Sequence, residues 1–258
     1  MAGPLPWVFH DSPDGLPTAA KALLAAAPVF EASMPWWRAA GRALAPGESA
    51  RFLLIGPEAA PVAVVPLRHE AGGRLGSLTS PYACLWQPLL APGLPEAGLR
   101  AVGRALGSAL RGHTPAALEA MDPMLPGLAA LRSGLWRGGL VPLVYAHFGN
   151  WHEKVAGLDW EAYLARRPGA LRETVRRRLR RMARTPGLTA QCWRGGEGLA
   201  AAIAEYEAVY AESWKEQEPY PDFGPALMRE AAAAGALRLW RLYEDGRPLA
   251  VQYWIVWR

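Results

Sequence analysis

The sequence predicts an α+β fold built from two successive units, each with a mostly antiparallel sheet flanked by helices, the second of them incomplete. Apolar residues recur every three or four positions at 95–111 and 199–214, which is the spacing of amphipathic helices. Strand-like runs flank turn residues at 56–61 and again at 244–247, which predicts two β-hairpins. The two units are expected at 1–148 and 149–258.

Proline and glycine divide the first unit into short elements. Pro28 ends a first helix, and Pro46-Gly47 follows a second helix that opens at Met34-Pro35. The long helix before Arg111 carries its leucines on one face and its arginines elsewhere, as an amphipathic helix should. Helices are expected at 18–27, 34–40, 95–111 and 124–134, and strands at 51–55, 62–67, 74–78, around Leu85 and at 140–145.

The second unit carries clearer signals at its element ends. Asp159 predicts the N-cap of a helix, and Pro168 is suited to open the basic helix that follows. Asp245-Gly246 is a strong signal for a tight turn between the last two strands. Helices are expected at 160–166, 168–185, 199–214 and 225–235, and strands at 237–243 and 248–257.

The two halves share a short sequence pattern. An offset of 187 positions places Pro61-Val62-Ala63-Val64 on Pro248-Leu249-Ala250-Val251, and Arg51 on Arg238. Either the halves are copies of one helix–hairpin unit, or two unrelated hairpins share a strand-like run. Strands and a long helix follow the first hairpin, whereas the chain ends soon after Pro248. If the halves are copies, the second is therefore incomplete.

Composition excludes several classes of protein. The 258 residues are 51% hydrophobic and 20% charged, which is typical of soluble globular chains and not of disordered ones. Proline, glycine or arginine interrupts each apolar run before it reaches about 18 residues, so no transmembrane segment is predicted. The N-terminus lacks a basic start and an apolar core, so we expect no secretory signal and a cytoplasmic location. The net charge of +5 does not by itself show whether the protein has an anionic partner.

Motifs for metal binding and for the common catalytic classes are absent. Cys84 and Cys192 have no second Cys or His at ligand spacing, so we predict neither a disulfide nor a metal site. The chain has no Walker A loop, no Gly-x-Ser-x-Gly, no His-Glu-x-x-His and no Gly-x-Gly-x-x-Gly after a strand. Most hydrolase, kinase and dehydrogenase classes therefore lose support.

A strongly basic helix is expected between 171 and 184. Its apolar residues, Leu171, Val175, Leu179 and Met182, form a narrow stripe that is expected to dock the helix. The cationic face is suited to RNA, to acidic lipid headgroups or to the phosphates of a nucleotide cofactor, or it is simply a solvated surface. The arginines are Arg172, Arg176, Arg177, Arg178, Arg180, Arg181 and Arg184.

Polar and titratable side chains gather at the end of the helix expected at 199–214. Ser213, Trp214, Lys215, Glu218 and Tyr220 lie within eight positions, where the chain turns into a loop. Loops of this kind are frequent binding sites. In the alternative interpretation, Lys215 only compensates the helix dipole and Trp214 covers the edge of the core. Spacing alone does not separate the two.

The same residues resemble a known family. Ser213-Trp214-Lys215-x-x-Glu218, then Phe223 and Arg229, then Asp245-Gly246-x-Pro248-x-Ala250 are similar to the GNAT-superfamily acyltransferases of the FemAB-like, cellulose-biosynthesis CelD type. These are tandem GNAT folds, often encoded near exopolysaccharide or cellulose-biosynthesis genes. The resemblance covers 36–258 and is most specific over the last hundred or so residues.

The resemblance implies a function and a set of site residues. An acyl group, expected to be acetyl, would pass from acyl-CoA to an amine or hydroxyl, on a sugar or cell-envelope precursor. Glu218 would act as the catalytic base, and Ser213, Trp214, Lys215 and Tyr220 would contact the acceptor. The anionic ligand would meet Arg172, Arg176, Arg177, Arg180 and Arg181.

Two alternative functions remain open, and the sequence differs from the GNAT family in one respect. The chain could instead be a non-catalytic module that binds RNA or a membrane surface through the basic helix, although RNA is not the favoured partner. An aminoacyl-tRNA-dependent transferase would combine both activities, since some FemAB-like relatives use charged tRNA. In GNAT enzymes the CoA pyrophosphate binds a turn that would lie beyond Arg258. The chain as given is therefore expected to be a fragment that binds acyl-CoA poorly.

Overall fold

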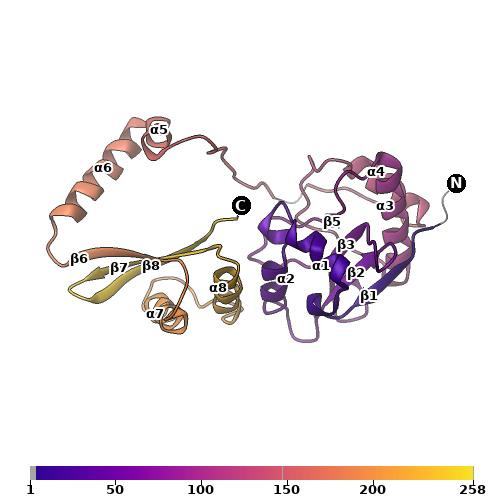
Figure 1. Ribbon diagram of the computed structural model, residues 1–258, viewed down its shortest axis with the longest axis horizontal. Coiled ribbons are helices and arrows are strands. Elements are labelled where there is room, and N and C mark those ends of the chain that lie inside the picture. Colours follow the sequence, from indigo (N-terminus) through magenta and orange to yellow (C-terminus); the bar gives the residue numbers. More distant parts are fainter. Residues whose placement is uncertain (1–3, 147, 258) are drawn as a thin grey trace. The chain divides into compact units, whose positions relative to one another are not determined.

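The computed structural model describes residues 4–146 and 148–257 (Figure 1). Contacts between residues divide them into two compact units. The first unit holds the described residues up to Phe148 together with Glu218–Ala234 and Trp257. The second unit holds Gly149–Gln217 and Gly235–Val256. Both are mixtures of helices and antiparallel sheet, so the predicted α+β class is confirmed.

A five-stranded sheet forms the centre of the first unit. The strands follow the order β1-β2-β3-β4, β5 pairs with β3, and these four strand pairs are antiparallel. The hairpin predicted across 56–61 is confirmed, because β2 and β3 pair along their full lengths. The strands are β1 Trp7–His10, β2 Ser49–Ile55, β3 Ala63–His69, β4 Leu75–Ser77 and β5 Leu89–Leu90.

Five α-helices belong to this unit. They are α1 Thr18–Ala25, α2 Met34–Ala40, α3 Glu96–Leu110, α4 Leu128–Arg137 and, from the distant part of the chain, α8 Phe223–Ala233. Ser33 caps α2, since its hydroxyl accepts from the Trp36 N–H at 3.5 Å, and Pro35 occupies the first turn, where its missing N–H costs nothing. The bounds of α2 agree with the helix predicted at 34–40, so that prediction is confirmed.

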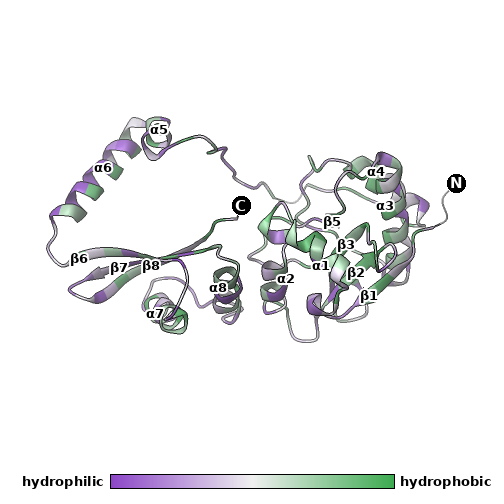
Figure 2. Ribbon diagram, viewed as in Figure 1, coloured by the Kyte–Doolittle hydropathy of each residue, from purple (hydrophilic) through white to green (hydrophobic). Residues whose placement is uncertain are grey.

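The main core lies between the sheet and α3. Leu53 of β2, Val65 of β3 and Leu106 of α3 belong to one buried cluster. In Figure 2 the strands of this sheet are green, in agreement with this burial. Because β2 and β3 are buried on both faces over much of their length, they form apolar runs without strict alternation.

Helices α3 and α4 pack backbone to backbone through glycines. A Cβ placed on Gly103 would lie 2.2 Å from the carbonyl oxygen of Leu131, and one on Gly134 would lie 2.3 Å from that of Arg100. Real Cβ atoms do not approach other atoms so closely. Gly107 and Gly138 repeat the arrangement one turn further along. The absence of side chains at these four positions therefore sets the distance between the two helices.

The second unit contains a three-stranded antiparallel sheet of order β6-β7-β8. Its elements are β6 Leu188–Trp193, β7 Leu237–Glu244, β8 Arg247–Ile255, α5 Trp160–Ala165, α6 Gly169–Arg184 and α7 Leu199–Ala211. Asp245 and Gly246 both have positive φ, 49° and 81°, as the turn of the predicted hairpin requires. Asp159 caps α5 as predicted, because its carboxylate accepts from the Ala162 N–H at 2.7 Å.

The two hairpins share one register under the offset of 187 positions. Ile55 pairs with Ala63 in the first hairpin, and their equivalents Leu242 and Ala250 pair in the second. Each hairpin follows one strand and two helices along the chain, and that strand pairs with the first hairpin strand. We call β1, α1, α2, β2 and β3 the N-terminal repeat, and β6, α7, α8, β7 and β8 the C-terminal repeat. This shared order and register favour duplication over a chance likeness of two hairpins.

Several expected elements are absent or displaced. The strand expected at 140–145 is irregular chain, because Pro142 interrupts it and its side chains lie exposed, with Val141 67% exposed, instead of meeting a sheet. The strand expected around Leu85 is also wrong, since pairing with β3 begins only at Leu89. The helix expected at 124–134 runs from Leu128 to Arg137. β1 and β6 were not predicted.

Candidate functional site

The residues expected to bind the acceptor fall on both sides of a unit boundary. Helix α7 ends at Ala211, three residues earlier than expected, so Ser213, Trp214 and Lys215 lie in the following loop of the second unit. Glu218 and Tyr220 belong to the first unit.

In the second unit, polar groups of the loop after α7 contact neighbouring residues of the same chain segment. The Ser213 hydroxyl accepts from the Lys215 N–H at 3.3 Å, and the Lys215 ammonium lies 5.2 Å from the centre of the Tyr210 ring. This cation–π contact anchors the loop to the last turn of α7. Trp214 is 93% exposed, so the interpretation that it covers the edge of the core is wrong.

In the first unit Glu218 is held by a tyrosine that the sequence analysis did not identify. The Tyr82 hydroxyl donates a 2.6 Å hydrogen bond to Glu218 Oε2. The Tyr82 ring stacks on Phe223 at 4.4 Å with an interplanar angle of 5°, and it meets the edge of Tyr220 at 6.3 Å. The Glu218 carboxylate is thus half-buried and held in position by this aromatic group.

A second titratable cluster lies in the second unit, between α7 and β7. The Tyr243 hydroxyl donates to Glu205 Oε1 at 2.6 Å, and the Arg241 guanidinium lies 3.6 Å from the same oxygen. Burial raises the pKa of the Tyr243 phenol above its usual value, and its bond to the Glu205 carboxylate raises it further. Sequence reasoning placed none of these residues in a site, because Glu205 and Tyr243 meet only when α7 packs on the sheet.

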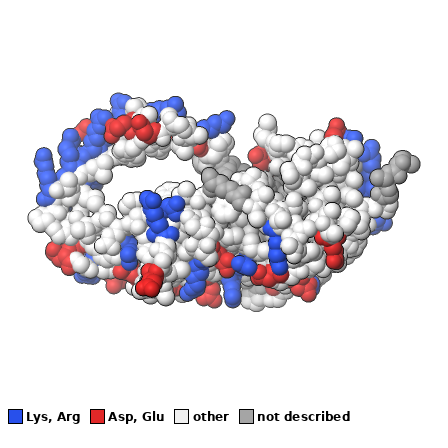
Figure 3. All heavy atoms as spheres, in the orientation of Figure 1, with Lys and Arg blue, Asp and Glu red and all other residues white. Residues whose placement is uncertain are grey.

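The basic helix is confirmed as α6 Gly169–Arg184, but its apolar stripe is not buried. No residue of α6 is buried, and Leu171 and Leu179 are 46% and 49% exposed. Within the described residues, Arg180 pairs with Glu173 at 2.8 Å and Arg172 donates to the Ala165 carbonyl at 3.1 Å. Lys and Arg atoms gather along this helix in Figure 3, and its polar residues are interrupted by apolar ones in Figure 2.

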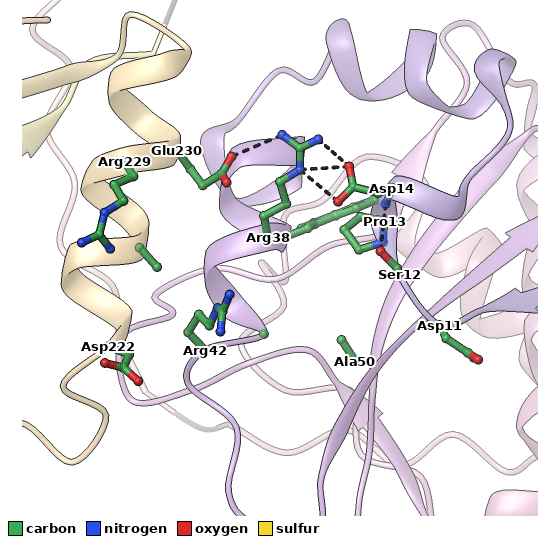
Figure 4. A pocket seen from close by; sticks show the side chains of 13 residues that line it. Asp11, Ser12, Pro13, Asp14, Arg38, Arg42, Ala50, Asp222, Arg229 and Glu230 are labelled. Carbon is green, nitrogen blue, oxygen red and sulfur yellow. Dashed lines mark hydrogen bonds and ion pairs between the residues drawn. The ribbon is translucent and has the colours of Figure 1, made fainter. Parts of the chain in front are cut away.

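A pocket of about 690 Å³ lies in the first unit between α2 and α8 (Figure 4). At one end Arg38 donates to Asp14 through Nε at 3.1 Å and through a second nitrogen, and it pairs with Glu230 of α8 at 3.3 Å. Hydrogen bonding from Arg38 holds the pKa of the Asp14 carboxyl below its ordinary value. The bond to Asp14 in turn raises the pKa of Arg38. This end of the pocket is therefore an ion-pair network of one guanidinium and two carboxylates.

Residues 4–146 and 148–257 contain no group of three or more His, Cys, Asp or Glu side chains placed to hold a metal ion. None of their helices has the length and apolar character needed to cross a membrane.

Comparison with known proteins identifies one segment of the chain. Residues 169–258 match the family model of the acetyltransferase (GNAT) domain. The match begins at α6 and includes the whole C-terminal repeat, with Glu205, Tyr243 and the loop after α7. Searches of curated proteins and of solved structures found no match to this chain.

Proposed function

We propose that this protein transfers an acyl group, with acetyl the expected group, from a CoA thioester to an amine or hydroxyl acceptor. The observation that carries the proposal is the match of residues 169–258 to the acetyltransferase (GNAT) domain. The acceptor nitrogen or oxygen attacks the thioester carbonyl carbon, and the carbon–sulfur bond then breaks. The acceptor loses a proton to a base, and the CoA thiolate leaves and takes up a proton from solvent.

Glu218 is the proposed base. Its carboxylate accepts a hydrogen bond from the Tyr82 hydroxyl at 2.6 Å and is half-buried beside aromatic rings, which supports a role for a fixed carboxylate. Ser213, Lys215 and Tyr220 are proposed to contact the acceptor, with Trp214 as an apolar wall. The anionic part of a ligand is proposed to contact arginines of α6, namely Arg172, Arg176, Arg177, Arg180 and Arg181.

The acceptor class follows from the sequence resemblance. We propose a sugar or a cell-envelope or exopolysaccharide precursor as the acceptor, in keeping with the FemAB-like, CelD-type pattern around Ser213-Trp214-Lys215. An aminoacyl-tRNA donor is the alternative to acyl-CoA, because FemAB-like relatives include enzymes that use charged tRNA.

The test of this function is release of free thiol from acetyl-CoA. A version of the protein extended to its natural stop should release CoA thiol when amino sugars are supplied and should show only background hydrolysis without an acceptor. Replacing acetyl-CoA by an aminoacyl-tRNA distinguishes the two donors. A folded protein that consumes neither donor with any amine or hydroxyl acceptor would contradict the proposal.

Binding of an anionic membrane surface is a second candidate function, and the uncovered stripe of α6 favours it. A basic amphipathic helix with an exposed apolar stripe between arginines matches helices that lie in the plane of a lipid interface. RNA binding would use the arginines but would not require the stripe.

The double substitution Arg177→Gln with Arg181→Gln should weaken binding to vesicles that contain anionic lipid. Each basic residue near such a surface contributes about 1 kcal/mol, so we expect a loss of roughly thirtyfold. Because both arginines are exposed, the melting temperature should hardly change. Vesicle sedimentation and thermal unfolding measure the two effects.

The matched control replaces Arg104 and Arg132 by glutamine, since both are exposed arginines outside α6. Leu179→Ser distinguishes membrane binding from RNA binding, because it should weaken vesicle binding and leave RNA binding unchanged. Vesicle binding that survives both the arginine and the leucine substitutions would show that α6 is only a solvated surface.

A further inference from the structure

One face of the sheet in the C-terminal repeat lacks the cover that its counterpart in the N-terminal repeat has. In the N-terminal repeat, alternate residues of β2 and β3 lie in the main core beneath α3 and are fully buried. They are Leu53, Ile55, Ala63, Val65 and Leu67. The offset of 187 positions places these residues on Trp240, Leu242, Ala250, Gln252 and Trp254 of β7 and β8.

The strand register shows that these equivalents share one side of the second sheet. In the first hairpin Leu53 pairs with Val65. In the second hairpin Trp240 pairs with Gln252, and on its other side Trp240 pairs with Cys192 of β6. Directly paired residues point to the same side of a sheet, and alternate residues of a strand return to that side. We call this surface the open face, and its residues are Cys192, Trp240, Leu242, Ala250, Gln252 and Trp254.

The open face is exposed although most of its side chains are apolar. Trp240 and Trp254 are 46% and 57% exposed, and Ala250 is exposed as well. Helix α7 packs on the other side of the sheet, where Tyr206 contacts Tyr253. An antiparallel sheet with one face in water normally carries polar side chains on that face. Two tryptophans there instead indicate a surface that another element covers.

We infer that the open face is the docking surface of an amphipathic helix equivalent to α3, and that this helix follows β8 in the natural protein. In the N-terminal repeat, α3 comes after the hairpin along the chain and contributes Val102 and Leu106 to the core over β2 and β3. The same order of elements in the C-terminal repeat places the counterpart of α3 after β8. The docking helix carries an apolar stripe and a polar outer face, as α3 does.

Helix α6 and a second copy of the chain are the other occupants that the test must separate. The apolar stripe of α6 is uncovered and lies in the same unit, so α6 could reach the open face by folding back over β6. The repeat favours the later helix, because in the described part of the N-terminal repeat no helix precedes β1, whereas α3 follows the hairpin.

The reactivity of the Cys192 thiol tests the inference, in a Cys84→Ser background that removes the other cysteine. In the 258-residue chain Cys192 should react readily with a thiol reagent such as DTNB, because the open face is uncovered. In a version of the protein extended to its natural stop, the docking helix should slow this reaction by roughly tenfold or more, since the thiol then reacts only after local opening. The measurement does not involve acyl transfer, so failure of the proposed function would not affect it.

Cys192→Ser is the matched control, because it leaves only Cys84, which is exposed in the first unit. Cys84 should react equally fast in both versions of the protein. Ala250→Arg in the Cys84→Ser background should restore the reactivity of Cys192 in the extended version, since its counterpart Ala63 is fully buried beneath α3. The same substitution should leave the melting temperature of the 258-residue chain nearly unchanged, because Ala250 is exposed there.

Equal reactivity of Cys192 in the two folded versions would overturn the inference, and so would a stop codon directly after the codon for Arg258. Protection of Cys192 already present in the 258-residue chain would also reject it. Protection that Leu179→Ser removes would assign the open face to α6. Protection that rises with protein concentration would assign it to a second copy of the chain. Circular dichroism of each variant establishes that the fold is intact.

Discussion

Replacing Glu218 by glutamine is expected to lower the turnover of acyl transfer by roughly 10²–10⁴-fold, which is the contribution of a general base. The amide keeps the shape of the side chain and an oxygen that can accept from the Tyr82 hydroxyl, now 2.6 Å from the carboxylate. Stacking of Tyr82 on Phe223 does not depend on the carboxylate. The fold should therefore survive while the proton acceptor is lost.

Steady-state kinetics between pH 6 and pH 9 measure this effect, with circular dichroism as a check on folding. Glu216→Gln is the matched control, since Glu216 is an exposed carboxylate two positions away, and it should leave turnover unchanged. Lys215→Met should instead raise the KM for the acceptor, because it removes a charge and keeps the apolar stem. Full turnover of the Glu218 variant across this pH range would assign the base to another group or to water.

The largest effect on stability is expected from Gly103→Val in α3. Its Cβ would lie 2.2 Å from the carbonyl oxygen of Leu131, which belongs to the backbone of the packed helix α4. Relief of the overlap requires α3 and α4 to separate, which also disturbs the contact at Gly107. We expect a loss of roughly 3 kcal/mol, at the upper end of the cost of overpacking. That is a large part of the stability of an ordinary domain.

Urea denaturation followed by tryptophan fluorescence measures this loss. Gly98→Ala in the same helix is the control, since its nearest neighbour is the end of the flexible Leu94 side chain at 3.2 Å. Alanine also favours helix more than glycine does, so this control should be neutral or stabilising. Equal stabilities of the two variants would show that the close approach of α3 and α4 does not limit the stability of the first unit.

Residues that act locally in the sequence correctly predicted the starts of helices and a tight turn. Ser33 and Pro35 at the start of α2, Asp159 before α5 and Asp245-Gly246 between β7 and β8 each act within a few residues of the chain. Such signals reflect the conformational preferences of those residues themselves. The repeat offset was also visible, because it needs only a comparison of the sequence with itself.

Features that join distant parts of the chain were missed. Tyr82 and Glu218 are 136 positions apart, and no spacing rule connects them. The glycines of α3 and α4 are ordinary helix residues until the two helices meet. β1 has no partner nearby in sequence, since it pairs with β2 some forty positions later. Cystine or metal motifs that would have revealed long-range contacts are absent from the sequence.

The placement of α8 has a consequence for synthesis on the ribosome. The first unit takes Glu218–Ala234 from between the two chain segments of the second unit, and Trp257 from after them. Translation proceeds at roughly 5–20 residues per second, so α8 emerges some seconds after the strands and helices it packs against. During that interval Trp36 lacks Phe223, and the apolar face of α2 that α8 later covers is open to water. The nascent chain therefore passes through a state in which holdase chaperones have a surface to bind, and only arrival of α8 removes it.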